Sequence, residues 1–162
     1  MAKRTSETPA TRFLKSRGVE FQERSYEYLA HGGTTEAARQ LERDEHCIIK
    51  TLVMKDAMAV PLIVLMHGDR SVSTKNLARE IETKSVVPCD SAEAQRHTRY
   101  QVGGTSPFGL LKPIPIYVEA SILELKSILI NGGKRGYLLE LDPAVLVDEL
   151  SAQPVRCANS AS

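Results

Sequence analysis

Lys50 is the first residue whose type and setting could do chemistry, because it lies inside the apolar stretch CIIKTLVM (47–54). The β-branched and apolar residues around it predict a strand over 47–56. A lysine there either faces solvent or points into a cleft, and Ile48 and Leu52 share its predicted face of the strand. Because lysine is rarely buried without a task, Lys50 is a candidate functional residue.

Two glycine-rich stretches, VGGTSPFG (102–109) and NGGKRG (131–136), form the second candidate. Several glycines weaken a helix or a strand, and a proline removes a backbone donor. Each stretch is either a plain tight turn or a loop that exposes consecutive backbone N–H groups to an oxyanion or a phosphate. Neither matches a P-loop or a dinucleotide-binding fingerprint.

The histidines, cysteines and serines show no metal-binding or nucleophile pattern. His31, His46, His67 and His97 lack HxxxH and HxH spacing, and the three cysteines form no CxxC pair. Ser106 does not lie in a GxSxG elbow. The spacing therefore predicts no metal site, and it identifies no Ser-His-acid triad.

Length, composition and charge fit one soluble globular domain. The chain has 162 residues, of which 42% are hydrophobic and 25% charged. The net charge of +1 is too small for a whole-domain nucleic-acid footprint, so a nucleic-acid partner requires a local basic patch. No apolar run approaches the ~20 residues of a membrane helix. The N-terminus also lacks the apolar core of a secretion signal, so we predict a cytoplasmic protein without membrane contact.

The elements that must position these residues are helices and strands in mixed order. We expect helices at 8–17, 73–82, 91–100 (capped by its first serine) and 142–150 (capped by Asp142). Within 31–42 we expect a turn at the two glycines and then a helix capped by Thr34 or Thr35. We expect strands at 19–28, 47–56, 59–69, 85–89, 114–118 and on both sides of GGKRG. Without a strict βαβ rhythm, this order predicts a single α+β domain with a mixed or barrel-like sheet. Residues 1–150 are the predicted domain, and 151–162 a loose polar tail.

Three blocks in this order together resemble the YbaK/EbsC family of bacterial trans-editing aminoacyl-tRNA deacylases: CIIKTLVM (47–54), YQVGGTSPFG (100–109) and INGGKRGYLLEL (130–141). The early TPATRFLKSRGVEF and YEY also match, so the resemblance covers roughly residues 8–150. It implies a mixed, partly barrel-like sheet flanked by helices, related to the editing insertion of bacterial prolyl-tRNA synthetases. It also implies hydrolysis of the ester between a wrong amino acid and the tRNA 3′ end, without metal or cofactor.

The resemblance also implies roles for residues. Lys50 would hold the terminal adenosine's phosphate or the substrate by charge, and Gly103, Gly104, Thr105 and Ser106 would stabilise the oxyanion. The attacking group would be the thiol of a mischarged cysteine or a ribose hydroxyl. The substrate-binding residues implied by the matching blocks are Tyr26, Gly33, Thr51, Pro107, Gly109, Asn131, Gly132, Gly133, Lys134, Arg135 and Leu138.

The implied substrate is Cys-tRNA(Pro) or a related small-residue mischarge, because the relatives nearest by motif remove cysteine. Gly33, Asn131 and Leu138 depart from the phenylalanine, serine and aspartate of those relatives, which predicts altered specificity. Implied partners are the 3′-terminal adenosine of aminoacyl-tRNA and prolyl-tRNA synthetase. A non-catalytic module that binds aminoacyl-tRNA or a synthetase stays open, as does an esterase that would depend on Ser106. The retained lysine and glycines favour the deacylase.

Overall fold

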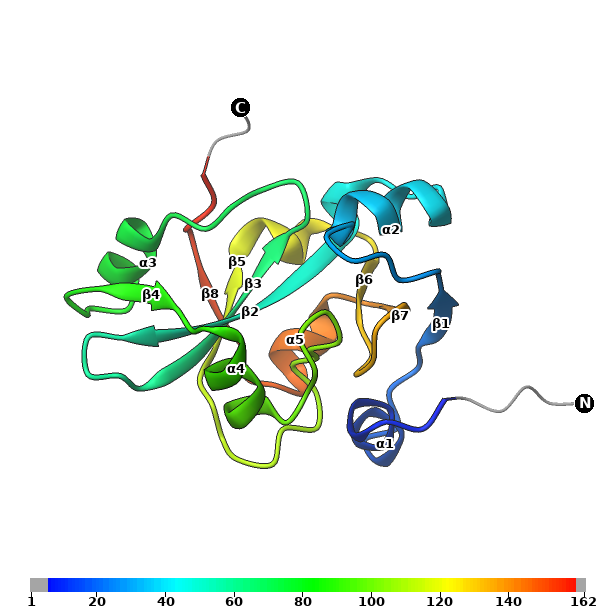
Figure 1. The fold of residues 1–162 in the computed structure, drawn as a ribbon, viewed down its shortest axis with the longest axis horizontal. Helices are drawn as coiled ribbons and strands as arrows, with labels where there is room; N and C mark the ends of the chain where they lie inside the picture. Colours follow the sequence, from blue (N-terminus) through cyan, green and yellow to red (C-terminus); the bar gives the residue numbers. More distant parts are fainter. Residues whose placement is uncertain (1–5, 160–162) are drawn as a thin grey trace, which may run out of the picture.

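The computed structural model describes residues 6–159 (Figure 1). Its α-helices are α1 (Pro9–Ser16), α2 (Gly33–Leu41), α3 (Thr74–Glu80), α4 (Ser91–Thr98) and α5 (Ala144–Asp148), with short 3-10 helices η1 (Glu45–Cys47) and η2 (Ala120–Glu124). The strands are β1 (Gln22–Ser25), β2 (Ile48–Asp56), β3 (Pro61–His67), β4 (Val86–Pro88), β5 (Ile116–Glu119), β6 (Ile128–Asn131), β7 (Tyr137–Leu141) and β8 (Gln153–Val155).

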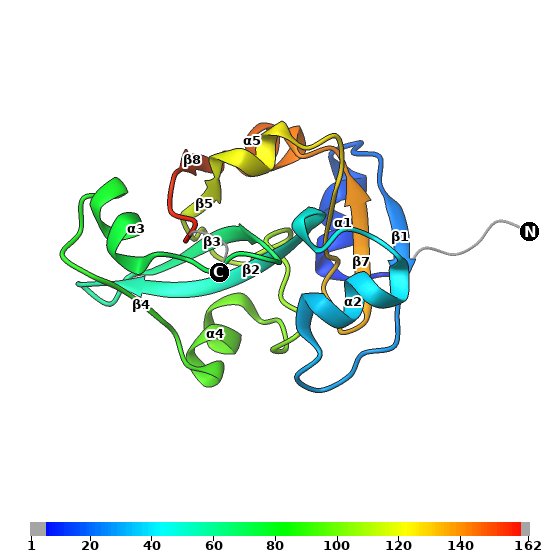
Figure 2. The same ribbon diagram turned by 90° about the horizontal axis from the view of Figure 1, so that it is seen from above.

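These strands form one mixed sheet in the order β1-β7-β6-β2-β3-β5-β8, and β4 pairs with β2. The pairs β2–β6, β3–β5 and β5–β8 are parallel, whereas β1–β7, β6–β7, β2–β3 and β2–β4 are antiparallel. Figure 2 shows β1 and β7 running across the direction of β2 and β3, so the sheet is strongly curved. The predicted α+β class with a mixed, curved sheet is confirmed.

The interior strand β3, between β2 and β5, is buried on both faces. All five residues from Leu62 to Met66 are at most 3% exposed, which explains why this strand is a continuous apolar run without alternation. Ile63 and Leu65 pack in the main core with Leu14 of α1 and Leu146 of α5. Val64 and Met66 pack on the other side in a second cluster that includes Leu77 and Ala78 of α3.

Most predicted elements form, but three helix starts differ from prediction. The N-cap of α2 is Gly32, and the hydroxyls of Thr34 and Thr35 instead donate to the carboxylate of Glu45, at 2.7 and 3.0 Å. Asp90, not the predicted serine, caps α4 through a reciprocal capping box with Glu93. The N-cap of α5 is Pro143, although the Asp142 carboxylate still accepts from the amide of Ala144 at 2.8 Å. The first helix begins as predicted, with Thr8 as its cap and Pro9 in the first turn.

The prediction of a loose tail from residue 151 is wrong for the segment 152–158. Residues 153–155 form β8, and Ala152, Val155 and Cys157 are at most 4% exposed. The buried carboxylate of Glu119 accepts from the amides of Cys157, at 2.7 Å, and Ala158, at 3.0 Å. A long-range polar anchor therefore orders a segment whose own composition looks loop-like.

Among the described residues, no helix is long and apolar enough to cross a bilayer.

Candidate active site

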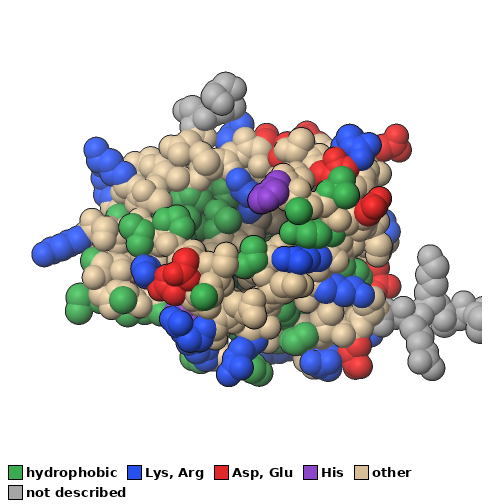
Figure 3. Space-filling model, viewed as in Figure 1, with side chains coloured by type: hydrophobic (Ala, Val, Ile, Leu, Met, Phe, Trp, Pro, Cys, Tyr) green, Lys and Arg blue, Asp and Glu red, His purple; other side chains and the backbone are tan. Residues whose placement is uncertain are grey.

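A cleft of about 900 Å³ opens between β2, the start of α2 and both glycine-rich loops. Figure 3 shows this face of the molecule hollowed beside a group of hydrophobic side chains, with a basic side chain and a histidine at the edge of the hollow. The cleft size is typical of a site for a small ligand. Of the residues predicted to form the site, those that line the cleft are Tyr26, Gly33, Lys50, Thr51, Gly103, Thr105, Asn131, Arg135 and Leu138.

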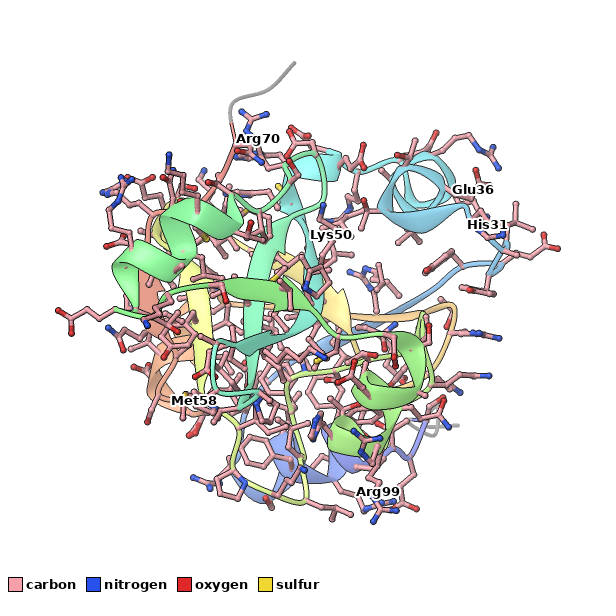
Figure 4. The ribbon with its side chains drawn as sticks, turned by 60° about the vertical axis from the view of Figure 1, so that its left-hand side comes forward. His31, Glu36, Lys50, Met58, Arg70 and Arg99 are labelled. Atoms are coloured by element: carbon pink, nitrogen blue, oxygen red, sulfur yellow. The ribbon has the colours of Figure 1, made fainter. Side chains whose placement is uncertain are left out.

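Lys50 points into this cleft and not to open solvent. Its side chain is half-buried, and Nζ donates a hydrogen bond to the backbone carbonyl of Arg70. Burial lowers the pKa of Lys50, while the nearby carboxylates of Glu45 and Asp69 oppose this shift. Figure 4 shows Lys50 between the loop that carries Arg70 and the region of α2, where Glu36 lies on the helix and His31 in the turn before it. An ammonium group has three donors, so two remain for a ligand.

Next to Lys50, the hydroxyl of Thr51 is buried but has no hydrogen-bond partner among residues 6–159. Buried hydroxyls are normally paired, so this oxygen is a candidate contact for a bound group. The wall at the α2 end of the cleft is apolar. Leu138 packs there with Ile48 and Ala37, and Tyr26 packs against the same cluster.

The two glycine-rich loops, predicted as separate features, form one unit at the mouth of the cleft. The Nδ2 of Asn131 donates to the carbonyl of Gly103 at 3.2 Å, and the Nε of Arg135 donates to the carbonyl of Val102 at 2.9 Å. The Oδ1 of Asn131 accepts from the amides of Gly133, at 2.7 Å, and Lys134, at 3.2 Å. Both polar atoms of the Asn131 side chain are therefore engaged: Nδ2 joins the two loops, and Oδ1 holds the backbone of its own loop.

The first glycine-rich loop, VGGTSPFG (102–109), has two backbone amides at the cleft without an acceptor in the described part of the chain. Gly103 and Thr105 line it, and within residues 6–159 their amides donate no hydrogen bond. The amide of Gly104 is already used, because it donates to the carbonyl of Gln101 at 2.8 Å. The hydroxyl of Ser106 is buried outside the cleft lining and accepts from the amide of Phe108 at 3.2 Å. An esterase that attacks through Ser106 finds no support in this arrangement.

The remaining predicted substrate-binding residues lie outside the cleft lining. A Cβ at Gly109 would lie 2.3 Å from the carbonyl oxygen of Pro9, and one at Gly132 would lie 2.6 Å from the ring of Tyr137. Other predicted residues outside the lining are Gly133, which faces Thr8 and Tyr100, the buried Pro107, and the exposed Lys134, whose Nζ lies 2.9 Å from the Ser6 hydroxyl. The structure gives the three glycines and Pro107 packing roles, and the role of all five residues as substrate contacts stays a prediction.

Sequence reasoning missed Tyr28, which also lines the cleft. The guanidinium of Arg135 lies 4.7 Å from the centre of its ring, and a Cβ at Gly103 would lie 2.9 Å from its hydroxyl. Its position two residues after Tyr26 is the signal that could have found it, because alternate residues of an extended segment share a side. His31, Ser71 and Thr74 line the same cleft and were also not predicted.

His46, His67 and Asp69 form the one group of described residues with metal-ligand types close together. The two imidazole rings stack with centroids 3.7 Å apart and planes 7° apart. Ring nitrogens bind metals in the ring plane, so two parallel stacked rings are poorly placed to share an ion. His46 Nδ1 contacts Asp69 Oδ1 at 2.8 Å. His67 Nδ1 contacts the His46 carbonyl at 2.7 Å, and its Nε2 contacts the Ser121 hydroxyl at 2.7 Å. This cluster supports the loop that carries Arg70.

Comparison with known proteins finds a family model and a relative whose sequences match this chain. Residues 32–149 match the family model described as "Aminoacyl-tRNA editing domain". The chain is 27% identical over 156 residues to the Enterococcus faecalis (strain ATCC 700802 / V583) protein named "Putative Cys-tRNA(Pro)/Cys-tRNA(Cys) deacylase EbsC", covering 94% of this chain and 95% of that protein. These matches include β2 and both glycine-rich loops.

Solved structures show the same fold. The hypothetical protein APE2540 is 25% identical, with a TM-score of 0.86 over 94% of this chain and 100% of its own. A structure described as "a putative trans-editing enzyme for prolyl tRNA synthetase" is 21% identical, with a TM-score of 0.80 over 96% of this chain and 100% of its own. At 21% identity the second likeness shows the fold alone.

Proposed function

The chain belongs to the aminoacyl-tRNA editing domain family, and from this premise we propose that it is a deacylase that hydrolyses the ester of mischarged aminoacyl-tRNA in trans. One observation carries the proposal. Lys50, on β2, and the free amides of Gly103 and Thr105, on a distant loop, line the same cleft. A cation and preorganised N–H donors are what an ester with a neighbouring phosphate requires.

The chemistry follows from where charge develops. Attack on the ester carbonyl leaves negative charge on its oxygen, and each well-placed donor there is worth about 2.7–4 kcal/mol. The amides of Gly103 and Thr105 are the proposed donors. Lys50 holds the phosphate of the terminal adenosine, or the substrate itself, with the two N–H groups that it does not give to the Arg70 carbonyl.

In this proposal the group that attacks the ester, or that activates water, comes from the substrate. The cleft lining contains Thr51, whose hydroxyl is unpaired, but among the described residues no histidine is hydrogen-bonded to it as a base. In one form, the thiol of the mischarged cysteine attacks its own ester carbonyl, its proton passes to the ribose oxygen that leaves, and water then opens the cyclic thioester to free cysteine. In the other form, a ribose hydroxyl of the terminal adenosine takes the proton of a water molecule that attacks the carbonyl, and the ester oxygen leaves with a proton. The protein then contributes orientation and charge stabilisation, which together account for large rate effects.

The proposed substrate is Cys-tRNA(Pro) or another tRNA carrying a wrong small residue. The name of the Enterococcus faecalis relative supports the cysteine form. The cleft itself offers little polar discrimination, since Leu138 contributes an apolar wall and the Asn131 amide is engaged with the loops. A Cβ at Gly33 would meet nothing within 4 Å, so this part of the site is open.

The test is a deacylation assay on tRNA(Pro) charged with cysteine, alanine or serine, with and without prolyl-tRNA synthetase. Release of amino acid above the uncatalysed rate supports the proposal, and acceleration by the synthetase supports that partner. Tight binding of all three charged tRNAs without any hydrolysis would instead identify a non-catalytic binding module.

A further inference from the structure

Arg135 is exposed at the mouth of the cleft, yet its Nε is committed to the carbonyl of Val102. We propose that Arg135 is a positioning residue for deacylation, and that this hydrogen bond aims the N–H of Gly103 at the carbonyl oxygen of the substrate ester. The proposal rests on the proposed deacylase function. It gives a structural reason for the arginine that follows Lys134 in the second glycine-rich loop.

The geometry of the peptide bond links the two groups. The carbonyl of Val102 and the N–H of Gly103 belong to one peptide plane, and in a trans peptide they point in opposite directions. Holding the carbonyl at 2.9 Å from Arg135 Nε therefore fixes the direction of the Gly103 N–H. Because Gly103 has φ +88° and no Cβ, its flanking peptide planes would otherwise be free to rotate.

Arg135 is itself held in place by its neighbours. Its guanidinium lies 4.7 Å from the centre of the Tyr28 ring, a cation–π contact that fixes the plane of the group. Gly104 packs against the backbone of the loop that carries Arg135, since a Cβ at Gly104 would lie 2.9 Å from the backbone nitrogen of Arg135. The next carbonyl, that of Gly103, is held by Asn131 Nδ2 at 3.2 Å. Two side chains from one loop thus clamp two successive peptides of the other.

The competing role for an exposed arginine at this position is a charge contact with tRNA phosphate. Two substitutions separate the roles because they divide the properties of arginine. Arg135→Gln loses the charge but keeps an N–H donor, since glutamine Nε2 is the same number of bonds from the backbone as arginine Nε. Arg135→Lys keeps the charge but has a methylene at that position.

The positioning role predicts that Arg135→Lys lowers kcat by roughly tenfold to 100-fold with KM nearly unchanged, which is less than the ~10²–10³ lost with a whole oxyanion donor. Arg135→Gln should keep kcat within about threefold of the wild type, since it restores the donor that holds the Val102 carbonyl. Arg156→Gln is the matched control, because it removes one exposed arginine outside the cleft lining. The reverse pattern, with an active lysine variant and a glutamine variant impaired in KM, would overturn the proposal.

A second readout needs no substrate. In protein labelled with 15N-glycine, the ten glycines give few enough signals to follow the Gly103 amide directly. Its resonance should move in Arg135→Lys and stay near the wild-type position in Arg135→Gln. An unmoved Gly103 signal in the lysine variant overturns the positioning role. A wild-type protein that is inactive on every charged tRNA refutes the proposed function, and the Gly103 signal still reports separately whether Arg135 orients this peptide.

Discussion

Replacing Lys50 with methionine should abolish most of the activity while leaving the fold intact. Methionine keeps the length and flexibility of the stem, and it suits a position flanked on β2 by Ile48 and Leu52. The ammonium is half-buried and its pKa is lowered by burial, so the charge is held in the cleft at a cost in folding free energy. Removing it relieves this cost, and it also removes the hydrogen bond to the Arg70 carbonyl.

The expected magnitudes differ for stability and activity. A lost hydrogen bond of this kind costs about 0.5–1.5 kcal/mol, and relief of desolvation acts in the opposite direction. The midpoint of thermal unfolding should therefore stay within about 2–4 °C of the wild type. A charge-assisted contact with substrate is worth about 1.5–3 kcal/mol. Its loss should lower kcat/KM by roughly 10-fold to 150-fold.

The assay compares Lys50→Met with the wild type and with Lys55→Met on tRNA(Pro) charged with cysteine. Lys55 lies on the same strand outside the cleft lining, and its Nζ is paired with Glu93 at 2.8 Å. The control should retain wild-type kcat/KM. If Lys50→Met is well folded and as active as the control, the assignment of Lys50 to the substrate is wrong.

Other predictions concern packing, pH, metals and specificity. Gly104→Ala should lose about 1–3 kcal/mol of stability and most activity, because its Cβ would lie 2.9 Å from the backbone of Lys134 and Arg135. Gly33→Ala, with nothing within 4 Å of its Cβ and only its φ of +58° as strain, should lose about 1–2 kcal/mol, as thermal unfolding can show. Hydrogen bonds from Arg43 lower the pKa of Glu140, so Glu140 stabilises the fold above its ordinary pKa and this contribution is lost as pH falls through the lowered value. Urea unfolding at neutral and acidic pH should therefore show a smaller acid-induced loss in Glu140→Gln than in the wild type. Prolonged EDTA treatment should leave deacylation unchanged. Activity that is lost to EDTA and restored by zinc would contradict the prediction that the site works without a metal. In a competition on one tRNA charged with cysteine, alanine, serine or proline, cysteine should be preferred by less than about 100-fold, and a larger preference would mean that thiol chemistry selects the substrate.

The elements around the cleft were predictable because their signals are local. The apolar run with one lysine predicted β2, and the paired glycine clusters predicted two loops in the right places. What joins them is not local. The contacts from Asn131 to Gly103 and from Arg135 to Val102 cross about thirty residues of chain, and no spacing in either loop reveals them. Hydrophobic periodicity identifies elements but not which loops meet.

Two of the wrong predictions, the cap of α2 and the tail, share a physical cause, which is a partner outside the segment that overrides local preference. Thr34 and Thr35 are good capping residues, but Glu45 accepts from both hydroxyls, and the cap is Gly32, two or three residues earlier than predicted. The segment after Ser151 looks like a tail because it is short and polar. The buried Glu119 carboxylate and the edge of β5 give its backbone partners that its own sequence does not indicate.

The pairing of β1 with β7, which sets Gln22 opposite Glu140, has a consequence for how the protein is made. During synthesis the hairpin of β2 and β3 leaves the ribosome well before β6 and β7 and can form from neighbouring residues. Strand β6, which carries Asn131, pairs in parallel with β2 and emerges much later. Pairing between strands that are far apart in the sequence is slow, and the apolar strands stay exposed until their partners are synthesised. The cleft, with walls running from Tyr26 to Leu138, is therefore a late product of folding, and a ribosome-bound chain that stops before the second glycine-rich loop should have no editing activity.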